Sequence, residues 1–162
     1  MEFYDVIMKR YSVRSYQDEP VDKEKLDRVL DVARQAPTGR NRQEWKIVIV
    51  SDVETRRRLA NASGQTFLEK APVVLAIVGL TPNQVMHCQV PADPVDCAIV
   101  LDHISLAAAA EGLGTCWIGH FDQRACCEIL QIPPSAKIIE MMTLGRPADK
   151  PAQGLPAGSG AK

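Results

Sequence analysis

The sequence predicts one layered domain of the α/β or α+β class, with helices on both faces of a four-stranded sheet. Its 162 residues suffice for one domain with a packed core and are too few for two. Four short, mostly apolar stretches have the length and composition of strands, and segments with helical periodicity separate them. This alternation of helices and strands favours a layered architecture.

Five segments with apolar residues at helical spacing are predicted to be helices: 2–10, 22–36, 52–62, 95–113 and 122–131. Asp22, Asp52 and Asp122 stand at the start of three of them, where an aspartate carboxylate can accept backbone N–H groups. Pro37 and Pro133 end two of the helices. The fourth helix is apolar almost all round, so it is expected to run through the core.

The predicted strands are 45–51, 73–79, 115–118 and 137–144. The second, VVLAIVG, is apolar throughout and is therefore expected to be central and covered on both faces. Residues 80–94 hold three prolines and are expected to form a long loop. The segment after the last strand is rich in Pro and Gly. The domain is thus expected to span 1–147, followed by an extended or disordered tail over 148–162.

Composition excludes several classes of protein. The formal net charge of −1 argues against binding nucleic acid or an acidic membrane through bulk charge. The longest apolar run, 95–113, contains three acidic residues and is a poor membrane span. The N-terminus lacks a signal-peptide core, so a cytoplasmic location is expected. The five cysteines are odd in number and unevenly spaced, which does not suggest a disulfide framework.

The segment RYSVRSY, residues 10–16, is a candidate anion grip. Residues two apart in an extended chain point the same way, so Arg10, Ser12 and Arg14 would share one face, opposite to Tyr11. Two guanidinium groups beside a hydroxyl suit a phosphate. From the pattern alone, however, a solvated loop whose arginines pair with surface acids is the better explanation.

Two further segments offer polar groups or open backbone. APTGRNRQEW, residues 36–45, places Thr38 and Asn41 ahead of a strand, although an ordinary helix-to-strand loop has the same composition. GLGTCWIGH, residues 112–120, ends a helix and begins a strand, and Gly119 leaves a backbone N–H where α/β sheets commonly bind ligands. Its G-x-G follows a helix and precedes a strand, the reverse of a dinucleotide fingerprint.

Cysteine and histidine chemistry supplies a competing hypothesis, a thiol or metal redox protein. No C-x-x-C or H-x-x-x-H arrangement occurs, so no metal site is expected. Cys126 and Cys127 lie on a predicted helix, where one thiol would face inward and the other partly outward. A G-x-S-x-G elbow is absent, which argues against a serine hydrolase. The run Arg56–Arg58 is interpreted as a solvated helix face.

Taken together, four segments resemble the nitroreductase family of FMN-dependent oxidoreductases, in the family's order, over residues 2–147. MKRYSVRSY is similar to its opening R-x-S-x-R, and APTGRNRQEWKIVIV to its A-P-S/T-x-x-N-x-Q-P-W loop and strand. The long helix with GLGTCWIG resembles its central helix and turn, and TLGRP its L-G-Y-P exit. The resemblance implies an α+β three-layer sandwich, a mixed, mainly antiparallel sheet flanked by helices, and an intertwined homodimer with FMN at the subunit interface.

Carried onto this sequence, the resemblance implies a cofactor site of eleven residues: Arg10, Tyr11, Ser12, Arg14, Pro37, Thr38, Gly39, Asn41, Trp117, Ile118 and Gly119. Arg10 and Ser12 would hold the phosphate and ribityl end of FMN, and Arg14 would lie by the pyrimidine edge of its ring. The Gly119 N–H would point at flavin N5. Residues 37–41 would come from the other subunit. No catalytic side chain and no metal is expected, because the flavin carries the chemistry.

The implied activity moves electrons from NADH or NADPH to a nitroaromatic, quinone or similar small molecule by a ping-pong cycle. Two alternatives stay open: a non-enzymatic flavin-binding or storage module, and a flavoenzyme fed by ferredoxin or reduced flavin. The sequence departs from the family at the C-terminus, where PADKPAQGLPAGSGAK has only Lys150 and Lys162 as cations for the phosphate. Glu44 replaces the usual proline, and the short segment 80–94 leaves little room for a lid, so an open substrate site is expected.

Overall fold

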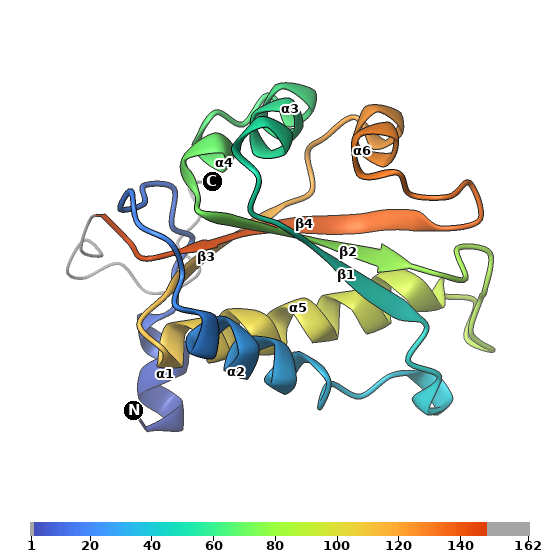
Figure 1. Cartoon of the computed structure of the whole chain (residues 1–162). Helices are drawn as coiled ribbons and strands as arrows, with labels where there is room; N and C mark the ends of the chain where they lie inside the picture. The colour runs from blue at the N-terminus through green and yellow to red at the C-terminus, as the bar shows by residue number, and fades with distance from the viewer. Residues whose placement is uncertain (1, 149–162) are drawn as a thin grey trace, which may run out of the picture.

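A four-stranded sheet lies between two layers of helices (Figure 1). The computed structural model describes residues 2–148. In chain order its elements are α1 (Phe3–Lys9), α2 (Lys23–Ala33), the 3-10 helix η1 (Gly39–Asn41), β1 (Trp45–Val50), α3 (Val53–Ser63), α4 (Phe67–Lys70), β2 (Val73–Gly79), α5 (Ala92–Ala110), β3 (Gly114–Ile118), α6 (Gln123–Leu130) and β4 (Lys137–Gly145). Helices α2 and α5 cover one face, and α3, α4 and α6 cover the other. The predicted α+β class is confirmed. The expected tail lies outside the described residues except for Ala148.

The strand order is β1-β2-β4-β3, and each neighbouring pair is antiparallel. Strand β2 is central and buried along its whole length, as its apolar sequence predicts. An extended segment adds to the β3 edge, where Ser12 forms a parallel bridge with Thr115. The Val13 N–H donates to the Thr115 carbonyl over 2.9 Å. The arrangement is therefore mixed and mainly antiparallel, as the resemblance implies.

Three predicted helix starts are confirmed by their caps. The carboxylates of Asp22, Asp52 and Asp122 each accept a backbone N–H from the first turn of α2, α3 and α6. A cap of this kind stabilises a helix by about 1 kcal/mol. Local sequence thus fixes where these helices begin.

Helix α5 is the longest helix and runs through the core, as expected. Its Val100, Leu101 and Ile104 are fully buried against the sheet. It begins at Ala92, three residues earlier than predicted, because the buried Asp93 accepts both the N–H and the hydroxyl of Thr81 and anchors an extra turn. Within residues 2–148, no helix has the length and apolar character of a membrane span.

Two other elements differ from the prediction. Helix α2 ends at Ala33 rather than residue 36. Helix α4 was not predicted, because four residues carry no measurable periodicity. Both differences concern short stretches whose conformation depends on what they pack against.

Arg56 is buried, so its interpretation as part of a solvated face was wrong. Its side chain lies in the interior and is only 8% exposed, while the next two arginines in sequence are exposed. The guanidinium donates to the carbonyl oxygens of Ser51 (3.3 Å), Glu69 (2.6 Å) and Ala71. Arg56 therefore ties the end of β1 to α4 and to the start of β2.

Candidate functional site

The segment that contains the two candidate arginines runs along the edge of β3. Val13 is buried, Ser12 and Arg14 are exposed, and Arg10 is half-buried. Burial raises the pKa of the Cys116 thiol, and the charge of Arg14, hydrogen bonding by Ser12 and the charge of Arg10 all counteract that rise. All three predicted side chains are therefore near enough to Cys116 of β3 to act on its thiol.

Two contacts fix this segment against the sheet. The Tyr16 hydroxyl donates to the Val13 carbonyl over 2.7 Å and lies 2.6 Å from Thr143 Oγ1. Val13 packs directly on Gly114, where an added Cβ would come within 2.9 Å of both Val13 Cβ and Pro147 Cγ. The absence of a side chain at Gly114 is what allows this close approach.

We expect Gly114→Ala to destabilise the fold by about 1–3 kcal/mol, because the new methyl group overpacks the contact with Val13. Urea unfolding followed by circular dichroism measures the change. The double variant Gly114→Ala with Val13→Ala removes the nearest contact, Val13 Cγ2, although the contacts with Val13 Cβ and Pro147 Cγ stay, so its cost should be somewhat less than the sum of the two single costs. Additive costs would show that the two residues do not press on each other.

A cavity of about 130 Å³ opens where β3 ends. Four predicted residues line it: Arg14, Trp117, Ile118 and Gly119. Four other residues also line it: Gln65 and Phe67, which no sequence motif singles out, and Cys116 and His120, which lie within the segment GLGTCWIGH. Gln65 lies in the connection between α3 and α4 and Phe67 is the first residue of α4, and only tertiary packing brings them here. The cavity is thus lined by a cationic side chain, by aromatic and apolar side chains and by the peptide of a glycine.

Glu140 lies behind Gly119, on the neighbouring strand. A Cβ on Gly119 would come within 3.1 Å of Glu140 Oε1. Glu140 Oε2 is buried and has no hydrogen-bond partner among the described residues, and burial raises the pKa of this carboxyl group. A side chain at position 119 would thus meet a carboxyl group, whereas glycine leaves the peptide plane open to a flat ligand.

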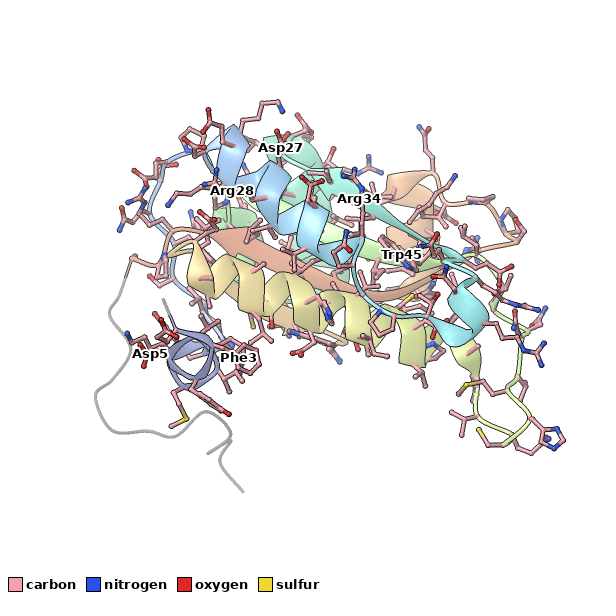
Figure 2. The ribbon with its side chains drawn as sticks, turned by 90° about the horizontal axis from the view of Figure 1, so that it is seen from below. Phe3, Asp5, Asp27, Arg28, Arg34 and Trp45 are labelled. Atoms are coloured by element: carbon pink, nitrogen blue, oxygen red, sulfur yellow. The ribbon has the colours of Figure 1, made fainter. Side chains whose placement is uncertain are left out.

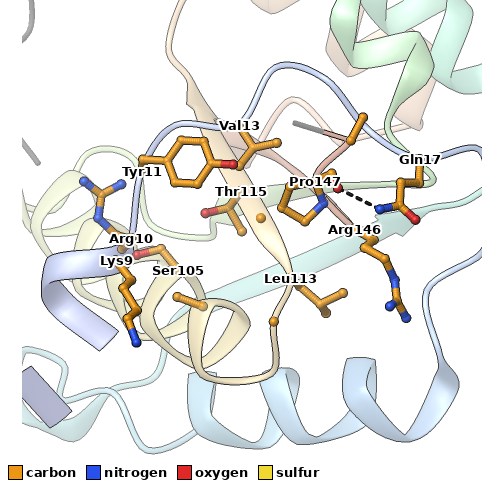
Figure 3. A pocket seen from close by; sticks show the side chains of 14 residues that line it. Lys9, Arg10, Tyr11, Val13, Gln17, Ser105, Leu113, Thr115, Arg146 and Pro147 are labelled. Carbon is orange, nitrogen blue, oxygen red and sulfur yellow. Dashed lines mark hydrogen bonds between the residues drawn. The ribbon is translucent and has the colours of Figure 1, made fainter. Parts of the chain in front are cut away.

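A larger cavity of about 410 Å³ lies on the Tyr11 side of the segment (Figure 3). Lys9 and Arg10 stand at one side of it and Arg146 at the other. Arg146 also pairs with Glu19. Two further basic side chains therefore line the cavity reached by Arg10, although the tail cations at 150 and 162 lie outside the described residues.

The loop between α2 and β1 carries the remaining predicted residues. Pro37, Gly39 and Asn41 are exposed, and Thr38 is half-buried. Thr38 Oγ1 accepts the N–H of Gln43 over 3.0 Å, which closes the loop on itself. Gly39 and the amide side chain of Asn41 are therefore exposed on the surface of the loop.

This loop and the arginine segment lie at opposite corners of the sheet. In Figure 1 the cyan turn before β1 is at one end and the blue segment after α1 is at the other, and Figure 2 likewise shows Trp45 far from α1. Trp45 pairs with Gly79, next to the start of β4, whereas Thr115 pairs with Leu144 near its end. Since β1 and β3 are the two edge strands, the separation is on the order of 25 Å. One chain brings the residues of the arginine segment and β3 together, but not those of the loop.

Reactive thiol or metal chemistry finds little support. Within residues 2–148, no cluster of three or more His, Cys, Asp or Glu side chains could hold a metal ion. Burial raises the pKa of Cys97 to about 12 and that of Cys126 to about 11, which disfavours the nucleophilic thiolate. As expected, Cys126 faces inward and Cys127 is half-buried.

Comparison with known proteins agrees with these features. The model of the nitroreductase family matches residues 7–79 and 63–146. An NADH dehydrogenase of Thermus thermophilus is 30% identical over 92% of this chain and 89% of its own length. An FMN reductase (NAD(P)H) of Bacillus subtilis is 29% identical over 88% of this chain, which covers 64% of that longer protein. The solved structure of an FMN-dependent nitroreductase from Clostridium difficile R20291 gives a TM-score of 0.82 at 26% identity, over 93% of this chain and 90% of that chain. The chain belongs to the nitroreductase family.

Proposed function

We propose that this protein is an FMN-dependent oxidoreductase, which takes electrons from NADH or NADPH and passes them to a nitroaromatic, quinone or similar small molecule in a ping-pong cycle. Membership of the family supports this function, as do relatives named for FMN and NAD(P)H. The single observation that carries it is that Arg10, Ser12 and Arg14 all act on Cys116 of β3, the strand that Gly119 follows. Residues 1–147 would act as one FMN-binding domain.

The protein's own residues bind and orient the cofactor. When bound, FMN supplies the redox chemistry, by accepting and releasing a hydride equivalent. Arg10 and Ser12 hold the phosphate and ribityl end, and Lys9 and Arg146 add positive charge near that grip. Arg14 would lie by the pyrimidine edge and stabilise the negative charge of the reduced ring. This charge arrangement offers a partial substitute for the family's basic C-terminal segment.

A homodimer completes the site. Because the loop over 37–41 and the arginine segment lie at opposite corners of the sheet, a second copy is needed to bring the loop onto the same ring. Helix α1 leaves Phe3, Tyr4 and Met8 largely exposed, an apolar face that suits burial against a partner (Figure 2). The dimer would work in the cytoplasm without nucleic acid or membrane.

The test is the visible spectrum of the purified protein, recorded before and after anaerobic NADH or NADPH. We expect bound FMN to bleach with the nicotinamide and to regain its colour when a nitroaromatic or quinone is added. A colourless protein that takes up no added FMN would contradict the cofactor. Bleaching by reduced ferredoxin or reduced flavin alone would assign a different donor, and a bound flavin that no donor reduces would assign a storage module.

A further inference from the structure

The loop over 37–43 is held in a backbone conformation that its sequence does not favour. Arg40, Asn41 and Gln43 have φ angles of 56°, 53° and 55°, in the left-handed region. For residues with a side chain, each such position costs roughly 1–2 kcal/mol, although asparagine tolerates it better. Three in one short loop require external contacts to hold the conformation.

One of these contacts comes from the helix beneath the loop. Asp96, half-buried on α5, accepts the backbone N–H of Gly39 on Oδ1 over 3.0 Å. A Cβ built on Gly39 would lie 3.8 Å from both carboxylate oxygens, so the carboxylate sits directly against this peptide. A hydrogen bond to an ionised acceptor is stronger than one between neutral groups.

The helix that carries Asp96 is itself firmly placed. One residue further along, Cys97 is fully buried, and one turn earlier Asp93 binds the N–H (3.1 Å) and hydroxyl (2.9 Å) of Thr81. The other end of the loop is tied by Arg42, whose guanidinium donates to Gln84 Oε1 in the segment before α5 and also pairs with Glu44 over 3.4 Å. Asp96 therefore fixes the position of residues 39–41 relative to α5.

We infer that Asp96 is a positioning residue for the cofactor site of the partner subunit. Its carboxylate holds the strained loop in the position in which Gly39 and Asn41 contact the flavin. Asp96 itself does not contact the flavin. This inference rests on the proposed function, which places the loop on the ring held by the other subunit's arginine segment. It assigns a role to a carboxylate that none of the family-like segments in the sequence singles out for the cofactor.

The first test measures FMN affinity of the dimer by fluorescence quenching. Asp96→Ala should weaken FMN binding by roughly ten- to a hundredfold, because the loop loses a charge-assisted hydrogen bond. Asp96→Asn keeps an oxygen that can accept the Gly39 N–H and should stay within about threefold of wild type. Asp102→Ala removes an exposed carboxylate from the same helix and should leave the affinity unchanged.

A second variant tests the same bond from the loop side. Gly39→Pro removes the N–H that Asp96 accepts and leaves α5 intact, and since Gly39 also meets the flavin in the proposed site, it should weaken FMN binding at least as much as Asp96→Ala. This variant keeps the inference testable if Asp96→Ala does not fold. Equal FMN affinity in wild type, Gly39→Pro and any folded Asp96→Ala dimer would overturn the positioning role and leave the proposed function intact.

Mixed dimers show which subunit's flavin the loop serves. One chain carries Arg10→Ala and the other Asp96→Ala, with different purification tags so that only mixed dimers are kept. If the loop acts across the interface, one site combines both defects and the other has none, so one FMN per dimer binds with wild-type affinity. If the loop acts within its own chain, each site has one defect and no tight FMN binds. That second result would overturn the inference and, with it, the proposed placement of the loop.

Discussion

Replacing Arg14 with alanine is expected to lower the midpoint potential of the bound flavin by roughly 30–60 mV. A charge-assisted hydrogen bond contributes about 1.5–3 kcal/mol, and 30 mV corresponds to about 1.4 kcal/mol for a two-electron couple. Arg14 lines the cavity at the end of β3 together with Ile118 and Gly119, and in the proposed site its charge would face the bound ring. The ring is negative at this edge only when reduced, so Arg14 should favour the reduced state.

Potentiometric titration of wild type and variant, with FMN at saturation, measures this shift directly. Arg14→Lys keeps a positive charge and should retain most of the potential, although it loses the planar fork of donors. Arg34→Ala is a matched control, because Arg34 is exposed on α2 and pairs with Asp31, far along the chain from the cavity. If Arg14→Ala keeps both the wild-type potential and the wild-type FMN affinity, then Arg14 does not face the ring.

Much of the fold could be predicted because the decisive signals are local. Asp22, Asp52 and Asp122 cap the helices that they were expected to cap, since a carboxylate acts on N–H groups two or three residues away. The apolar run of β2 lies at the centre of the sheet, because a strand covered on both faces needs apolar residues at every position. Neither feature depends on distant parts of the chain.

Features that depend on tertiary contacts were missed. Helix α4 is too short for a periodic pattern, and its position follows from packing of Leu68 into the core under α3 and α6. The run of three arginines has the composition of a solvated helix face, and only the carbonyl groups around Arg56 distinguish it from its neighbours. Sequence alone does not say where such acceptors will gather.

The candidate site also combines features that local sequence predicts with features that depend on tertiary contacts. Alternation in an extended chain predicts that Arg10, Ser12 and Arg14 share one face, opposite to Tyr11, and all three act on the Cys116 thiol. Arg10 nevertheless lines the larger cavity together with Tyr11, whereas Arg14 lines the cavity at the end of β3. Gln65 and Phe67 join the cavity only through the path of the chain between α3 and α4, so no motif could have named them. The loop over 37–41 lies at the far corner of the sheet, and its part in the site stays a prediction that mixed dimers can test.

Replacing Arg56 with methionine is expected to destabilise the protein by about 3 kcal/mol or more. Methionine can fill the space of the aliphatic stem, but it leaves the carbonyl groups of Ser51, Glu69 and Ala71 without their donor. A buried acceptor that loses its partner costs roughly 1–3 kcal/mol, which applies fully to the Ala71 carbonyl and less to the partly exposed carbonyls of Ser51 and Glu69. Urea unfolding at one fixed protein concentration measures the loss, since the stability of the proposed dimer would depend on concentration.

The neighbouring arginine supplies the control for this prediction. Arg57 is exposed and pairs with Glu54 one turn away, so Arg57→Met should change stability by less than about 1 kcal/mol. Because Arg56 also ties α4 to the start of β2, its loss should loosen Phe67 at the cavity and weaken FMN binding in the fraction that stays folded. Equal stability of Arg56→Met and Arg57→Met would mean that water reaches these carbonyl groups. The interior between α3, α4 and β2 would then be open to solvent rather than closed by one buried cation.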